Sequence, residues 1–150
     1  MKPTQRFSYA LKALVDLAVH QGIGPVTTAA IANRQGIPVR SLEQLFNRLR
    51  RKGLITAERG PRGGYRLGRP ADQIPVRAVF EALEPQELSS KKRAAAPRRT
   101  DGTADPVRAI WHQVESAVRT TLDATTLGVL AEQMQDQVAP PMRHRYTFHI

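Results

Sequence analysis

Residues 34–68 read RQGIPVRSLEQLFNRLRRKGLITAERGPRGGYRLG, and this stretch decides the fold. Pro38 suits the first turn of a helix, because its missing N–H has no intrahelical partner there. The helix continues through Lys52, and Gly53 then provides a left-handed C-cap. After Gly53 the apolar period shortens, and two short strands are expected at 54–59 and 65–67, joined by a glycine-rich loop. The stretch therefore predicts a helix followed by a β-hairpin.

Two further helices are expected upstream. Apolar residues recur at helical spacing over 7–18, with Thr4 as the N-cap and Gly22 or Gly24 as the stop. A short helix follows over about 28–34, capped by Thr28 or Thr27 and ended by Gly36. Three helices and then a hairpin form the order of a winged helix-turn-helix. Its small internal core is expected to contain Ile31, Ile37, Leu42 and Leu45, and Ala32 lets the second and third helices approach closely.

The third helix has two distinct faces when its residues are placed at about 100° intervals. The apolar arc contains Val39, Leu42, Leu45, Phe46 and Leu49. The polar face contains Arg40, Gln44, Asn47 and Arg51, flanked by Ser41 and Arg48 on one side and by Glu43 and Arg50 on the other. Amide, hydroxyl and guanidinium groups can read base edges and hold phosphates. The alternative, a solvated helix face, would more often alternate Glu and Lys, so the composition favours DNA binding.

Composition points the same way. The chain has 150 residues, with 23 Lys and Arg against 13 Asp and Glu, and its net charge of +10 favours a polyanionic partner. Nucleic acid is the first such partner and an anionic membrane surface the second. Arg59 and Arg62 at the tip of the hairpin could enter a minor groove or hold its phosphates. The glycines there resemble a phosphate loop, but the Lys-Ser/Thr pair and the following helix of such a loop are missing.

The C-terminal half predicts an extension that makes a dimer. Residues 75–83 read as a fourth helix, and Asp105-Pro106 opens a long helix to about Leu122, followed by a short helix over 126–135. We expect a homodimer through the apolar stripe of the long helix, formed by Val107, Ile110, Trp111, Val114 and Val118. The expected divisions are a DNA-binding domain (1–86), a basic loop (87–104), a dimerisation helix with a short helix (105–137) and a tail (138–150). The fold class is mainly α with a small β-hairpin wing.

Several function classes are excluded by what the chain lacks. Because it has no cysteine, disulfides, thiol catalysis, Cys-bound zinc and ordinary iron–sulfur clusters are ruled out. The four histidines have no i,i+3 or i,i+4 spacing, and no catalytic triad or carboxylate pair stands out, so neither a metal site nor an enzyme is expected. No apolar segment approaches the roughly 20 residues of a membrane span, and Lys12 and Asp16 interrupt any leader-like run. The expectation is a soluble cytoplasmic protein.

The run LEQLF…LR…GL…RG..GGY within 34–68 resembles the DNA-binding domain of the IscR/NsrR-type family of bacterial transcription regulators. The resemblance extends through the first helix, IPVRAVFEALE (74–84), AIWHQV (109–114) and TTLGVL (125–130). It implies a dimeric winged-helix protein that binds a pseudo-palindromic promoter site, with the long helix crossing its partner. By resemblance the DNA contacts are Arg40, Ser41, Glu43, Gln44, Arg59 and Arg62, to which the polar helix face adds Asn47 and Arg48.

The chain departs from this family at one place. Many members bind an iron–sulfur cluster through three cysteines in the loop before the long helix. Here residues 87–111 read ELSSKKRAAAPRRTDGTADPVRAIW, without cysteine, and Arg108 stands where a ligand histidine can precede the Trp. The chain thus resembles a cluster-free branch, and we expect a repressor without cofactor. Two alternatives stay open: a module that responds to a small molecule or partner protein, and a basic RNA-binding protein.

Overall fold

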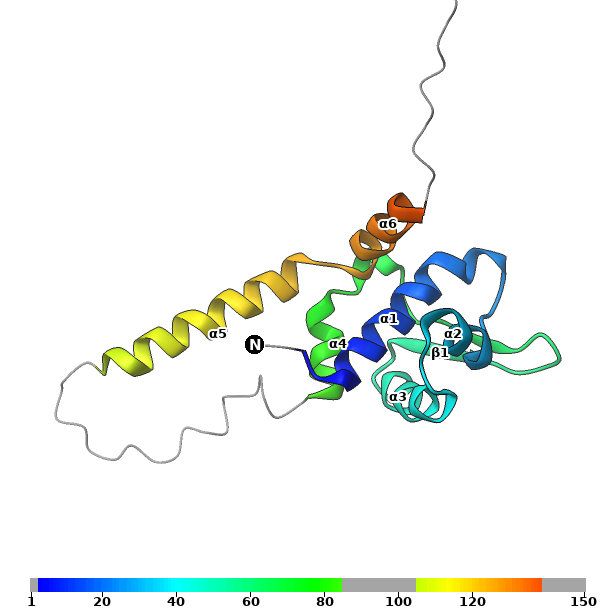
Figure 1. Ribbon diagram of the computed structural model, residues 1–150, viewed down its shortest axis with the longest axis horizontal. Helices are drawn as coiled ribbons and strands as arrows, with labels where there is room; N and C mark the ends of the chain where they lie inside the picture. Colours follow the sequence, from blue (N-terminus) through cyan, green and yellow to red (C-terminus); the bar gives the residue numbers. More distant parts are fainter. Residues whose placement is uncertain (1–2, 85–104, 139–150) are drawn as a thin grey trace, which may run out of the picture.

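A computed structural model describes residues 3–84 and 105–138, and it confirms the winged helix-turn-helix. Helices α1 (Gln5–His20), α2 (Thr28–Gln35) and α3 (Val39–Arg51) precede the antiparallel strands β1 (Ile55–Glu58) and β2 (Gly64–Leu67) (Figure 1). They are followed by α4 (Val76–Leu83), α5 (Pro106–Ala124) and α6 (Leu127–Val138). Two short 3-10 turns, η1 (Gln21–Ile23) and η2 (Ala71–Gln73), complete the described elements, and the sequence had indicated neither.

Local capping chemistry fixes the helix boundaries. The side chains of Thr4 and Thr27 accept hydrogen bonds from backbone N–H groups in the first turns of α1 and α2. Gly36 ends α2 in the left-handed conformation, with φ of 64°, and Gly53 follows α3 with φ of 71°. Pro38 is the N-cap of α3 rather than its first helical residue. Most of the predicted ends are therefore right to within two residues.

A hydrophobic core joins α1, α2, α3, α4 and the hairpin. Its fully buried side chains include Leu14, Ile31, Phe46 and Leu49. Val39 belongs to the same arc of α3 but is 43% exposed. Val39 is the first residue of α3, and the core covers the apolar arc only from Leu42 onward.

The hairpin is held firmly against the helices. Val26, just before α2, exchanges two backbone hydrogen bonds with Tyr65 of β2, at 2.8 and 3.0 Å. Glycine is needed at position 64, because a Cβ there would lie 2.6 Å from the Val26 carbonyl oxygen. The Tyr65 ring also packs edge-on against Phe46 of α3, with centroids 4.8 Å apart. These contacts fix the direction of the hairpin relative to α3.

A buried carboxylate connects α1 to α2. The Asp16 side chain has no solvent exposure and accepts hydrogen bonds from Nε (2.9 Å) and Nη2 (2.6 Å) of Arg34 and from Nε2 of Gln35 (2.9 Å). Burial alone would raise the pKa of Asp16. The hydrogen bonds and the charges of Arg34 and His20 lower it by more than burial raises it, so the pKa lies below its ordinary value. The sequence does not predict this role, because it shows Asp16 only as a charge that interrupts an apolar run.

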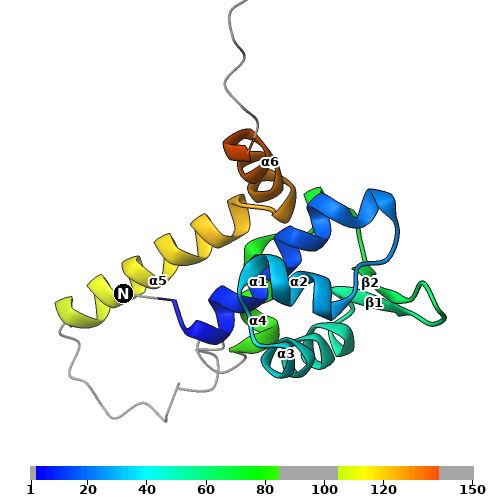
Figure 2. The same ribbon diagram turned by 45° about the vertical axis from the view of Figure 1, so that its right-hand side comes forward.

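The two C-terminal helices differ in how they pack. Helix α5 extends away from the domain (Figures 1 and 2) and contains no buried residue. Helix α6 packs on α1, and its Leu127 and Ala131 join the domain core. From the sequence, both helices are expected in one segment, 105–137, with ends at about 122 and 135. In the structure the second helix continues to Val138.

No helix within 3–84 or 105–138 is both long and apolar enough to cross a membrane. The basic loop at 87–104 and almost all of the predicted tail lie outside the described residues.

Candidate nucleic-acid interface

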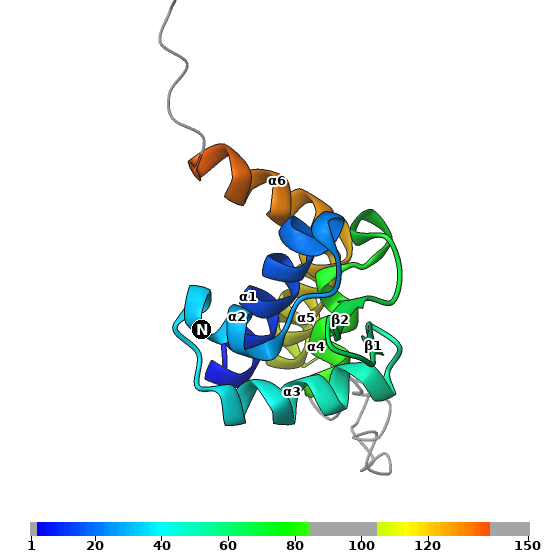
Figure 3. The same cartoon turned by 90° about the vertical axis from the view of Figure 1, so that its right-hand side faces the viewer.

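The polar side of α3 forms one wall of the candidate site. Figure 3 shows α3 along one side of the molecule, with the β1–β2 hairpin next to it. The residues predicted on this helix all lie on its accessible side: Arg40, Glu43, Gln44, Asn47 and Arg48 are exposed and Ser41 is partly buried. The buried face of the same helix holds Leu42, Leu45, Phe46 and Leu49. The core therefore directs the polar face outward.

The hairpin tip brings a second group of cations to the molecule. Arg59 and Arg62 are exposed in the turn between β1 and β2, as expected for a wing. Further down the strands, Arg66 donates to the carboxylate of Glu58 across the hairpin. Arg66 is therefore neutralised within the chain, whereas the two tip arginines remain positive at the surface.

The predicted arginines share one electrostatic property. Within the described ranges, the structure gives no ion-pair partner to Arg40, Arg48, Arg59 or Arg62. Arg77 of α4, by contrast, pairs with Glu81 and Asp123. Uncompensated guanidinium groups suit an anionic partner, because bidentate hydrogen bonds to phosphate oxygens are among the strongest that arginine makes.

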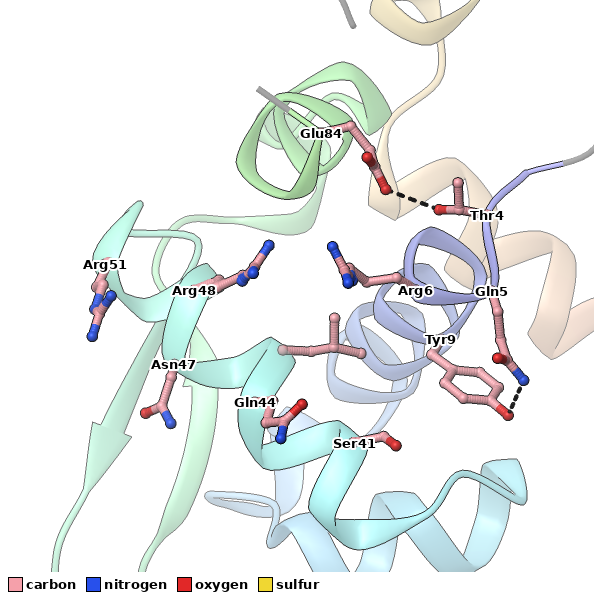
Figure 4. A pocket seen from close by; sticks show the side chains of 11 residues that line it. Thr4, Gln5, Arg6, Tyr9, Ser41, Gln44, Asn47, Arg48, Arg51 and Glu84 are labelled. Carbon is pink, nitrogen blue, oxygen red and sulfur yellow. Dashed lines mark hydrogen bonds between the residues drawn. The ribbon is translucent and has the colours of Figure 1, made fainter. Parts of the chain in front are cut away.

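A groove between α1 and α3 adds residues that the sequence had not indicated. Its volume is about 730 Å³, and Arg6 and Tyr9 of α1 face Ser41, Gln44 and Arg48 of α3 across it (Figure 4). Arg6 and Tyr9 lie more than 30 residues before the polar side chains of α3 in the sequence. Only the tertiary packing of α1 against α3 therefore brings them to the site. Their one local signal is their i,i+3 spacing on the first turns of α1.

The start of α1 is fixed at the edge of this groove. The Thr4 hydroxyl caps α1 by accepting from the Phe7 N–H at 3.2 Å, and it donates to Oε1 of Glu84 at 3.0 Å. Gln5 Nε2 donates to the Tyr9 hydroxyl oxygen at 2.9 Å. The first turn of α1 is thus anchored both to its own backbone and to the end of α4 (Figure 4).

Known proteins with the same arrangement are transcriptional regulators. Residues 3–133 match the Rrf2 family, described as iron-dependent transcriptional regulators. The chain is 39% identical to the HTH-type transcriptional regulator IscR of Aliivibrio salmonicida over 130 residues, which are 87% of this chain and 77% of that protein. It is 40% identical to IscR of Photobacterium profundum over 130 residues, 87% of this chain and 75% of that protein.

Solved structures agree with these relatives. T. potens IscR is similar with a TM-score of 0.77 and 32% identity, covering 93% of each chain. CymR, the global cysteine regulator of B. subtilis, has a TM-score of 0.73 and 30% identity, covering 89% of this chain and 98% of that one.

Proposed function

Because this chain belongs to the Rrf2 family of DNA-binding transcription regulators, we propose that it binds an inverted-repeat promoter site as a homodimer and represses transcription there. The observation that carries the proposal is the exposed surface of α3 and the hairpin tip, whose arginines have no ion-pair partner in the described part of the chain. A repressor needs only to occupy a promoter, and its site of action is the cytoplasm, where the DNA lies.

Within this surface we assign different tasks to different side chains. Glu43 and Gln44 on α3 carry acceptors and donors that match base edges in the major groove, and Asn47 has the same amide chemistry as Gln44. Arg40, Ser41 and Arg48 position α3 through phosphates. Arg59 and Arg62 extend from the hairpin to the adjacent minor groove or its phosphates.

Helix α5 supports the homodimer. Val107, Ile110, Trp111 and Val114 are all exposed, and Trp111 reaches 62% exposure, although together they form one apolar stripe. Exposed stripes of this kind mark protein–protein contacts. Half-sites on successive turns of DNA lie about 34–36 Å apart, and a two-fold axis across α5 would present two α3 helices to such an inverted repeat.

The residues present do not fit an iron–sulfur cluster, although the family is described as iron-dependent. A cluster needs thiolate ligands, and the chain has no cysteine. Nowhere in 3–84 or 105–138 do three His, Asp or Glu side chains gather as metal ligands do. Arg108 stands exposed near the start of α5. We therefore propose a regulator that acts without a cluster.

Selection of DNA from a random duplex pool by the purified protein tests this function. We expect the selected sites to be two-fold symmetric and to bind about 10³-fold or more tightly than scrambled duplex. Run-off transcription from a promoter that contains such a site should fall as protein is added. Equal affinity for scrambled duplex, or preference for single-stranded RNA of the same sequence, would contradict DNA recognition, and a rise in transcription would contradict repression.

A further inference from the structure

We propose that the groove between α1 and α3 is a phosphate-binding site in which Arg6 of α1 and Arg48 of α3 hold one phosphate group, supplied by the backbone of bound DNA. The proposal rests on the proposed function and extends it to a helix outside the helix-turn-helix and the wing. It makes α1 a direct participant in DNA binding.

The geometry points to a shared ligand. Arg6 and Arg48 stand on opposite walls of the groove, and their guanidinium groups are directed into the same gap (Figure 4). Arg51 also lines the groove, but its side chain is directed away from this gap (Figure 4). A water molecule takes about 30 Å³, so a groove of about 730 Å³ has room for a phosphate group and the atoms next to it.

The charges in the groove favour an anion. Two guanidinium groups directed at one gap repel each other unless a negative group lies between them. Glu84 is the carboxylate that lines the groove, but its Oε1 accepts from the Thr4 hydroxyl, and neither Arg6 nor Arg48 has an ion pair within the described residues. Phosphate oxygens accept paired hydrogen bonds from guanidinium groups, so a phosphate between the two arginines would satisfy both.

Neutral hydroxyl donors line the other end of the groove (Figure 4). The Tyr9 hydroxyl oxygen accepts from Gln5, so its own hydrogen is available to a phosphate oxygen. Ser41 contributes a second hydroxyl from the α3 wall, about two helical turns before Arg48. Hydroxyl groups and arginines are the side chains that proteins use for DNA phosphates. DNA that runs along α3 would bring a backbone phosphate to the groove, so the groove is placed to recognise the strand that flanks the bases read by α3.

Salt-dependent binding of the Arg6→Gln variant tests the proposal. We expect weaker binding to the selected site and to scrambled duplex by the same factor. The slope of log affinity against log salt should become shallower, by at most about 2 per dimer (one phosphate for each subunit at about 0.9 each), because Arg48 then faces that phosphate alone. Lys12→Gln, which removes an exposed cation from α1 outside the groove, is the matched control and should keep the wild-type slope. A wild-type slope in Arg6→Gln, with unchanged thermal unfolding, overturns the proposal.

A second measurement identifies the source of the phosphate. Selected sites with a single neutral methylphosphonate linkage are titrated with wild type and with Arg6→Gln. At the linkage that contacts the groove, wild type should lose affinity while Arg6→Gln loses none. Absence of any such coupled linkage, together with Arg6-dependent binding of inorganic phosphate to the DNA-free protein, overturns the DNA assignment. Failure of wild type to prefer its selected site would instead refute the proposed function, so the two failures are distinguishable.

Discussion

The side chain of Asp16 shows how much one residue contributes to this domain. Among the described residues, Asp16 is the charged one that is fully buried. Its carboxylate accepts three hydrogen bonds from side chains of α2. We predict that Asp16→Asn, which keeps the shape but removes the charge, destabilises the domain by about 2 kcal/mol in urea unfolding. Glu81→Gln, which breaks the exposed pair with Arg77, is the control and should cost much less, because solvent screens exposed pairs. Equal losses would contradict a structural role of Asp16.

The same carboxylate predicts a pH dependence. Its pKa is lower in the folded than in the unfolded state, because the hydrogen bonds and charges around it outweigh the effect of burial. Its contribution is therefore complete above its unfolded pKa of about 3.9 and is lost as the pH falls through the folded pKa. The stability difference between wild type and Asp16→Asn should stay constant from pH 7 to pH 5 and shrink below about pH 4. A difference that grows on acidification would contradict this sign.

Glu43 is the residue through which we expect α3 to discriminate bases. Its carboxylate is exposed on the polar face and can accept from N4 of cytosine. Glu43→Ala should relax discrimination at one position in each half-site by about 1–3 kcal/mol while leaving binding to scrambled duplex nearly unchanged. Competition with single-base variants of the selected site measures this. Equal losses on specific and scrambled DNA would remove Glu43 from the base-reading residues.

At the scale of elements, the hairpin should hold DNA without reading most of its sequence. Arg59→Ala and Arg62→Ala should each weaken binding to selected and scrambled duplexes alike and reduce the salt slope by about 1 for each phosphate that is no longer neutralised. The exposed Arg108 of α5 provides the control, because Arg108→Ala removes the same charge far along the chain from the hairpin. Filter binding over a range of KCl concentrations measures both quantities. A changed base preference without a changed slope would assign the tip to sequence readout instead.

The elements also show which features a sequence can predict. Thr4, Gly36 and Gly53 act through their own backbone neighbours, so the boundaries of α1, α2 and α3 follow from local chemistry. The same holds for the polar face of α3, which depends on helical periodicity alone. The packing of α6 on α1 and the approach of Arg6 to Arg48 depend on contacts between distant segments. Such contacts leave no periodic signal in the sequence, which is why neither feature could be predicted from it.

At the scale of the whole molecule, the missing thiols separate this chain from iron-dependent relatives. We predict that protein purified without oxygen carries no stoichiometric iron and has no visible charge-transfer absorption, because no cysteine is present to ligate a cluster. DNA binding should be unaffected by nitric oxide, oxygen and thiol oxidants. Metal analysis and binding assays before and after exposure test this. One iron or more for each chain would show that other ligands hold iron, and loss of binding on exposure would show that a group other than a thiol responds to the reagent.

The apolar stripe of α5 is the surface through which we expect two chains to form the dimer. Ile110 is 53% exposed on α5 and belongs to the apolar stripe, whereas Ser116, also exposed, lies about 180° around the same helix from the centre of that stripe. Ile110→Glu should therefore place a charge in the dimer contact, and Ser116→Glu should place the same charge outside it. Light scattering at micromolar concentration should give twice the chain mass of 16.7 kDa for wild type and Ser116→Glu, but the single mass for Ile110→Glu.

Loss of the dimer should also weaken operator binding, because each half-site would then be bound without its neighbour. Linked binding modules gain about 10²–10⁴-fold in affinity, so Ile110→Glu should lose a factor in this range on the symmetric site. On a single half-site, its affinity should equal that of the wild-type monomer, because Ile110 does not contribute to the domain core. A monomeric wild type, or an Ile110→Glu variant with full operator affinity, would show that α5 is not the dimer contact.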